Sequence, residues 1–118
     1  MDAKVHELLN QQINKEFYSA YLYLDFSVFY EAQGLDGFAN WYMIQAQEER
    51  DHAMLFLDYL KENGVRADLE LIEKPVIKEE TAKGILAQGL EHEQYVTSLI
   101  NDIYAAAYEV KDFRTMEF

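Results

Sequence analysis

Glu49 and His52 are the pair of residues in this sequence whose types and spacing most directly indicate chemistry. They lie three positions apart, so on a helix they share one face, about one turn from each other. A carboxylate oxygen and an imidazole nitrogen together suit a transition metal. Glu-x-x-His also occurs by chance on acidic helix faces that only contact solvent. Other acidic residues in the sequence favour the metal-binding interpretation of this pair.

Two more carboxylates, Glu16 and Glu93, stand in the middle of apolar stripes of helical period. A buried carboxylate without a partner costs several kcal/mol, and three converging ones need something to neutralise them. A bound cation provides that neutralisation. Carboxylates and imidazole without thiolate suit iron or manganese, and zinc less decisively. Two helices giving one Glu each and two giving Glu-x-x-His is the donor pattern of di-iron bundles, although this sequence contains one such pair.

These residues lie on three long predicted helices, and a fourth helix starts near the end of the sequence. The patterning predicts them over residues 5–33, 38–62, 81–110 and 113–118. Asp2 is the expected cap of the first helix, Gly34 ends it, Asn63-Gly64 ends the second, and Asp112 caps the last. The short connector between the first two helices makes them antiparallel. Residues 65–80 include the only proline and predict a long crossover, which makes the third helix parallel to the second.

Some further expectations concern individual side chains. Leu69, Leu71 and Ile72 are predicted to attach the crossover to the helices, and His6 and His92 are expected at the surface. The inward stripe of the third helix is predicted to be Leu86, Gly89, Glu93, Val96, Ile100, Ile103 and Ala107.

Size and composition restrict the class of protein. At 118 residues we expect a single all-α domain over 1–118. A formal net charge of −12 argues against nucleic-acid binding, because phosphates would be repelled. With no cysteine, disulfides, thiolate metal sites and cysteine nucleophiles are excluded. No segment reaches the length of a membrane span and the first residues lack a signal-peptide pattern, so we expect a cytoplasmic protein without membrane contact.

Several segments resemble the non-haem ferritins of bacteria and archaea. They are Gln12–Tyr23 (QINKEFYSAYLY), Gly34–Trp41 (GLDGFANW), Ala46–Ala53 (AQEERDHA), Glu91–Gln94 and Glu109–Phe113, in that order along the chain. The resemblance covers essentially the whole sequence. It implies a ferritin-like four-helix bundle with a long crossover between helices B and C, here with helices A, B, C and the start of D.

The resemblance also implies an iron-oxidising site. Glu16, Glu49 and His52 resemble ligands of the first ferroxidase iron, with Glu49 bridging to a second iron that Glu93 also binds. Tyr23 resembles the tyrosine beside that site, which can donate an electron or a hydrogen bond, and Glu48 resembles a ligand of an accessory third iron position.

The implied function is iron storage: Fe(II) is oxidised by dioxygen or peroxide, and the ferric product enters the cavity of a homo-oligomeric shell, usually of 24 subunits. Haem-binding relatives carry a methionine directly after the helix B glutamate, where this chain has Arg50, so no haem is expected.

Ferritins continue beyond the position that matches Phe118, through most of helix D and a short helix E. The missing part would complete the second iron site and the shell contacts. The alternative reading is therefore a truncated helical fragment without competent ferroxidase activity, which dimerises through its exposed bundle face.

Overall fold

Four α-helices and no strand make up the fold of the computed structural model, which describes residues 1–118. The helices are α1 (Ala3–Ala32), α2 (Asp36–Glu62), α3 (Ala82–Glu109) and α4 (Phe113–Glu117). This confirms the all-helical class and the four predicted segments, whose ends differ from the prediction by two residues at most.

The predicted helix ends are confirmed by their hydrogen bonds and backbone angles. The Asp2 carboxylate accepts from the backbone N–H groups of Lys4 and Val5, which satisfies two donors at the start of α1. Gly34 and Gly64 follow α1 and α2 with φ of 73° and 69°, in the left-handed region that favours glycine. Asp112 caps α4 through the backbone N–H of Thr115.

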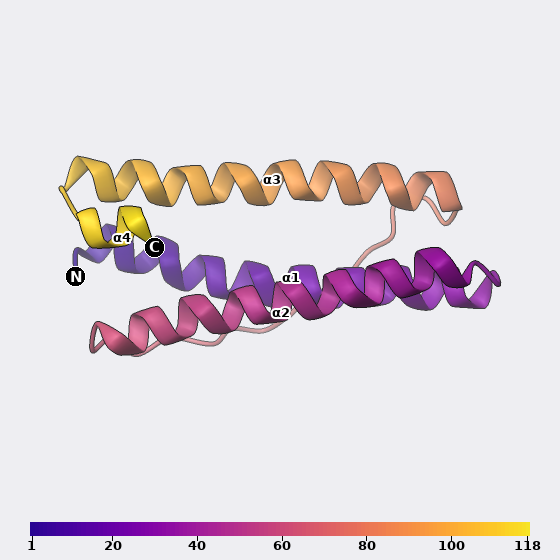
Figure 1. The fold of residues 1–118 in the computed structure, drawn as a ribbon, viewed down its shortest axis with the longest axis horizontal. Coiled ribbons are helices and arrows are strands. Elements are labelled where there is room, and N and C mark those ends of the chain that lie inside the picture. The colour runs from indigo at the N-terminus through magenta and orange to yellow at the C-terminus, as the bar shows by residue number, and fades with distance from the viewer.

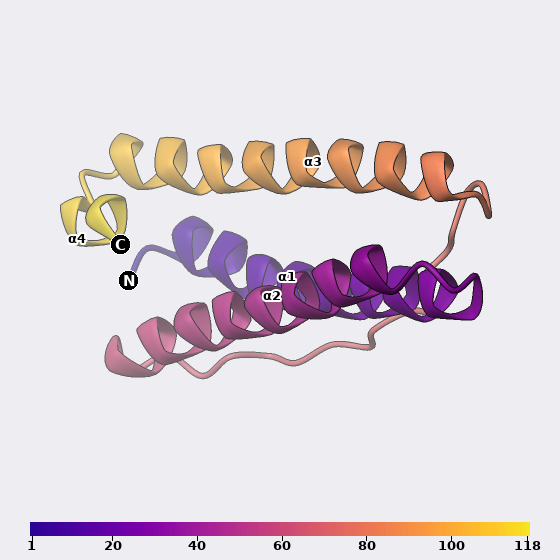
Figure 2. The ribbon, with the colours of Figure 1, turned by 45° about the vertical axis from the view of Figure 1, so that its right-hand side comes forward.

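The helices lie along one long axis, in a molecule that measures 49 × 22 × 22 Å (Figure 1). α1 and α2 are antiparallel and pack along their length, and α3 returns antiparallel to α1 and therefore parallel to α2, as predicted. α3 packs mainly on α1, and Figure 2 shows it as a separate rod above the α1–α2 pair. α2 approaches α3 at Tyr42. A Cβ added to Gly89 of α3 would lie only 2.5 Å from the Tyr42 hydroxyl.

The crossover between α2 and α3 runs extended along α1 and is attached by two asparagines. The Asn10 side chain accepts from the backbone N–H of Asp68 at 2.7 Å and donates to its carbonyl at 3.1 Å. Asn14 donates to the same carbonyl and accepts from the N–H of Glu70 at 2.9 Å. An extended segment outside any sheet leaves its backbone groups unpaired, so side-chain amides on α1 satisfy them.

The predicted attachment of the crossover through leucine and isoleucine is wrong. Leu69, Leu71 and Ile72 are 64%, 87% and 41% exposed. The one crossover residue that is buried is Pro75.

The core is divided into two apolar clusters along the axis. One contains Leu22, Tyr23, Phe26, Tyr30, Ala39, Tyr42, Ala46 and Ile85, and the other contains Val5, Leu9, Ile13, Tyr59, Leu60, Ile103 and Ala107. Between them, α1 buries Gln12, Glu16 and Ser19, and α2 buries Glu49. A polar layer therefore crosses the middle of the bundle, enclosed at both ends by apolar packing.

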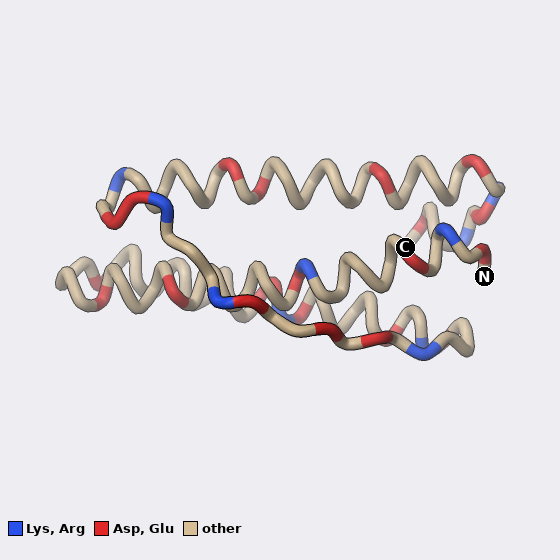
Figure 3. Tube along the Cα trace, turned by 180° about the vertical axis from the view of Figure 1, so that it is seen from behind, with Lys and Arg blue, Asp and Glu red and all other residues tan.

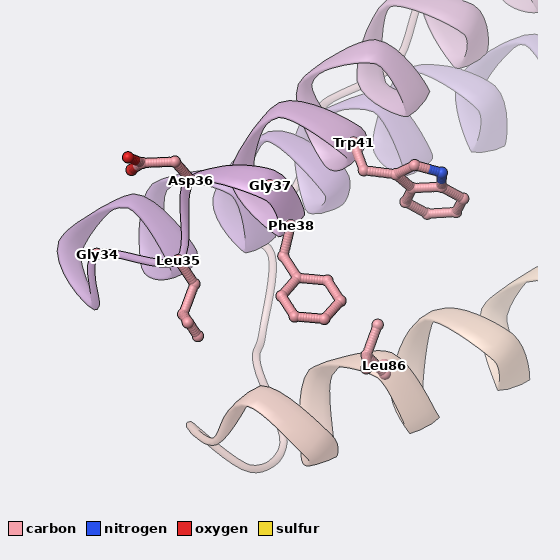
Figure 4. Close-up of a pocket in the computed structure, with 7 residues that line it drawn as sticks. All are labelled: Gly34, Leu35, Asp36, Gly37, Phe38, Trp41 and Leu86. Atoms are coloured by element: carbon pink, nitrogen blue, oxygen red, sulfur yellow. The ribbon is translucent and has the colours of Figure 1, made fainter.

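The inward stripe predicted for α3 is only partly correct. Gly89, Val96, Ile103 and Ala107 are buried, but Leu86, Glu93 and Ile100 are exposed. α3 packs on one long helix rather than two, so it buries a narrower stripe than a helix inside a complete bundle. The open side includes a pocket of about 600 Å³, lined by Leu35, Phe38 and Trp41 near the start of α2 and by Leu86 of α3 (Figure 4).

Acidic residues occur on every helix and along the crossover, with few basic residues between them (Figure 3). None of the helices combines the length and apolar character that a membrane span requires.

Candidate metal centre

The polar layer contains a cluster of three metal-ligating side chains. Glu16 comes from α1, and Glu49 and His52 come from successive turns of α2. One ligand atom from each lies within 4.8 Å of the others. His52 Nδ1 is 3.5 Å from Glu49 Oε2 and 3.9 Å from Glu16 Oε2. The structure thus brings together three of the six predicted site residues.

The cluster is buried on its carboxylate side and open on its histidine side. Glu16 and Glu49 are 1% and 6% exposed, whereas half of the His52 side chain is exposed. Glu16 Oε2 and Glu49 Oε2 are the two buried side-chain oxygens that have no hydrogen-bond partner. Buried polar atoms are almost always paired, so two unpaired carboxylate oxygens that converge with an imidazole fit a cation. Oxygen and nitrogen donors without a thiolate suit iron or manganese.

The surroundings of the cluster also change the ionisation of Glu49. Burial, followed by the adjacent Glu16 carboxylate and the charges of Glu93 and Glu48, raises the pKa of Glu49 to about 9. Without a cation, this side chain holds a proton at neutral pH. A metal ion that binds here displaces that proton.

Glu93 and Tyr23 form a second polar contact beside the cluster. The Tyr23 hydroxyl donates a hydrogen bond to Glu93 Oε1 across the α1–α3 interface. Burial and this carboxylate raise the pKa of Tyr23 far above its usual value, so the phenol keeps its proton and remains a donor. Glu93 is itself exposed, and it lies outside the three-residue cluster.

Glu48 lies outside the three-residue cluster. It is exposed on α2 and makes no hydrogen bond or ion pair with the other predicted ligands. Its charge still contributes to raising the pKa of Glu49.

The expectation that His92 lies at the surface is only partly correct. Its ring is partly buried, with Nε2 2.7 Å from the Ser19 hydroxyl and its centroid 5.7 Å from that of Tyr23. Burial lowers the pKa of His92. The ring packs here because Ser19, one turn after Glu16, offers a buried hydroxyl on the face of α1 that meets α3.

Sequence reasoning missed Gln12. Its side chain is 2% exposed, and its Nε2 donates to Glu16 Oε1 at 2.8 Å. The available signal was its position four residues before Glu16, which places both on one face of a helix.

Comparison of the sequence with known protein families identifies the family of this chain. The sequence profile of the ferritin-like domain matches residues 6–118. The chain belongs to the ferritin family. It is 36% identical over 118 residues to a probable bacterial non-heme ferritin-like protein of Haemophilus influenzae, covering 100% of this chain and 72% of the relative. It is 34% identical to the bacterial non-heme ferritin of Campylobacter jejuni, again over the whole chain and 71% of the relative.

Solved ferritin structures have the same fold. An open pore ferritin from Archaeoglobus fulgidus superposes with a TM-score of 0.96 at 40% identity, covering 100% of this chain and 73% of that one. Chlorobium tepidum ferritin gives a TM-score of 0.95 at 32% identity, covering 99% of this chain and 72% of that one. These neighbours confirm a ferritin-type bundle in which α1, α2 and α3 are helices A, B and C, and α4 is a short piece of helix D.

Proposed function

We propose that this protein stores iron, and that it oxidises Fe(II) at a site centred on Glu16, Glu49 and His52. The observation that carries the proposal is the pair of buried, unpaired oxygens on Glu16 and Glu49 that face the His52 imidazole. Membership of the ferritin family supports iron as the metal. The bacterial relatives are named non-heme ferritins, and Arg50 follows Glu49, so the proposal includes no haem.

The residues of the chain have distinct parts in this reaction. The carboxylates of Glu16 and Glu49 provide negative charge in a buried layer, which stabilises Fe(III) more than Fe(II) and so favours loss of an electron to dioxygen or peroxide. Glu49 loses its proton when iron binds. His52 is the half-exposed ligand, and it gives Fe(II) a route from solvent.

Three further residues extend the site. We propose that Glu49 bridges to a second iron that Glu93 also binds, and that Glu48 contributes to an accessory iron position. Tyr23 hydrogen-bonds Glu93 and would hold that carboxylate in place, and its phenol can supply an electron. The charge of Glu93 contributes to raising the pKa of Glu49, and this electrostatic coupling supports including Glu93 in the proposed site.

Storage requires self-assembly, and the molecule has apolar surface for it. The outer face of α1 and α2, beside the crossover, exposes Tyr21, Leu24, Met43 and Ile72 around a shallow pocket. Contiguous exposed apolar surface on a chain of this charge is typical of subunit contacts. We propose a homo-oligomeric shell, with a dimer through the open face between α2 and α3 as the alternative. Sizing chromatography distinguishes a shell of hundreds of kDa from a dimer of the 13.9-kDa chain.

Aerobic oxidation of Fe(II) tests the proposed function directly. The wild-type protein should convert Fe(II) to a coloured ferric product faster than buffer does, and Glu49→Ala should slow this at least tenfold. Asp51→Ala is the matched control, because Asp51 is an exposed carboxylate on the same helix outside the cluster. An unchanged rate in Glu49→Ala would place the oxidation elsewhere.

A further inference from the structure

Gln12 is a buried residue that donates a hydrogen bond to Glu16, one of the three residues of the metal-ligand cluster. We propose that Gln12 is a positioning residue: it holds the Glu16 carboxylate so that one oxygen, Oε2, is directed at the metal. This inference rests on the proposed function of the cluster. It assigns a role in that site to a residue that cannot reach the metal itself, because its donor contacts the opposite oxygen of Glu16.

The two carboxylate oxygens of Glu16 have different surroundings. Gln12 Nε2 donates to Oε1 at 2.8 Å, while Oε2 has no hydrogen-bond partner and lies 3.9 Å from His52 Nδ1. Both side chains are almost fully buried, at 2% and 1% exposure. Water therefore does not compete for Oε1, and the amide of Gln12 is its one hydrogen-bond donor.

The orientation of the amide follows from the chemistry of the two groups. An ionised carboxylate only accepts hydrogen bonds, so the NH₂ of Gln12, and not its carbonyl oxygen, must face Glu16. The last torsion of a glutamate side chain is soft and roughly two-fold, so packing alone does not fix the plane of the carboxylate. The hydrogen bond to Oε1 fixes it. Hydrogen bonds of this kind orient metal-binding carboxylates, and their removal typically weakens metal binding 10- to 100-fold.

The preceding residue in the chain provides a matched control. Gln11 Nε2 donates to Glu7 Oε1 at 3.3 Å, which is the same Gln–Glu pairing at a spacing of four residues. Gln11 and Glu7 are both exposed and are outside the metal-ligand cluster. Breaking this pair removes the same kind of interaction from the same helix without reaching the site.

The test is Zn²⁺ binding by calorimetry to wild type, Gln12→Met and Gln11→Met, with Glu49→Ala identifying the signal from the cluster. We expect Zn²⁺ affinity to fall 10- to 100-fold in Gln12→Met and to stay within about twofold in Gln11→Met. Gln12→Leu also removes the donor, so it should weaken binding to a similar extent, and it serves as the second variant if methionine disturbs folding.

The visible absorption spectrum of bound Co²⁺ distinguishes a positioning role of Gln12 from a purely structural role, which would leave the spectrum unchanged. If Gln12 fixes the carboxylate, the visible bands of Co²⁺-loaded Gln12→Met change in position and intensity, whereas a packing role lowers only the thermal midpoint of the metal-free protein. If Gln12→Met keeps the wild-type Zn²⁺ affinity and the wild-type Co²⁺ spectrum, the role of Gln12 is refuted, while the proposed function of the cluster is unaffected. Wild-type binding that is insensitive to Glu49→Ala overturns the proposed function, and this inference with it.

Discussion

Replacing Glu49 by glutamine changes the metal-binding ability of the cluster while leaving the metal-free fold nearly intact. In the metal-free protein, burial and the neighbouring carboxylates raise the pKa of Glu49 to about 9, so at pH 7 its side chain is already neutral. Glutamine has the same shape and is also neutral. We therefore expect the free energy of unfolding of the metal-free variant to stay within about 1 kcal/mol of wild type.

The effect with metal present should be large. A divalent metal at 100 times its dissociation constant stabilises the wild type by about 2.7 kcal/mol. If the loss of one of three donors weakens binding about a hundredfold, the same metal concentration stabilises Glu49→Gln by only about 0.4 kcal/mol. At about 4 °C per kcal/mol for a chain of this size, the metal-induced rise in the thermal midpoint falls from about 11 °C to about 2 °C.

The assay is thermal unfolding followed by circular dichroism, with and without Zn²⁺, which avoids redox chemistry. Asp51→Asn is the control and should keep the full metal-induced rise, because Asp51 is an exposed carboxylate outside the cluster. A wild-type rise in Glu49→Gln would refute the assignment of Glu49 as a ligand. A large loss of stability in the metal-free variant would instead refute the reasoning that Glu49 is neutral at pH 7.

Four further predictions concern the cluster and the helix packing around it. Tyr23→Phe removes the donor to Glu93 and should slow Fe(II) oxidation while Zn²⁺ affinity at the cluster stays nearly unchanged, which stopped-flow absorbance and calorimetry can compare. Because the raised pKa of Glu49 keeps its proton at pH 7, Zn²⁺ binding should release about one proton, seen by calorimetry in buffers of different ionisation enthalpy. The same shift makes the metal-free fold less stable as the pH rises from about 4.5 to about 9, since the unfolded state loses this proton first, and urea unfolding at several pH values measures it. Gly89→Ala places a Cβ 2.5 Å from the Tyr42 hydroxyl and should lower the free energy of unfolding by about 1–3 kcal/mol, again by urea unfolding.

The helices and the central ligand pair could be predicted because local patterns determine them. Asp2, Gly34 and Gly64 act through backbone geometry at single positions, so their roles are visible in the sequence. Glu49 and His52 share a helix, and their spacing alone places them together. Adding Glu16 required only that the first two helices pack antiparallel, which the short connector between them ensures.

The features that sequence reasoning missed depend on contacts between distant segments. Attachment of the crossover relies on Asn10 and Asn14, more than 50 residues before the backbone that they bind. His92 is partly buried because its ring meets Ser19 of α1, and neither residue signals this alone. Gln12 was the exception, since a helical spacing to Glu16 was visible, but an amide on a helix gives no sign of whether it will be buried.

The position of Glu93 illustrates the same limit for the site itself. The sequence predicts an inward carboxylate on the third helix, but the structure leaves Glu93 exposed, hydrogen-bonded to Tyr23 and coupled to Glu49 only through its charge. Which face of α3 is covered depends on what packs against its open side, and that is a property of the whole bundle.

Anomalous X-ray diffraction at the iron edge, on crystals of the protein exposed to Fe(II), tests the central claim most directly. We expect an anomalous peak between Glu16, Glu49 and His52, which disappears in crystals of Glu49→Ala. Iron that binds only elsewhere on the protein, with no peak among these three side chains, would contradict it.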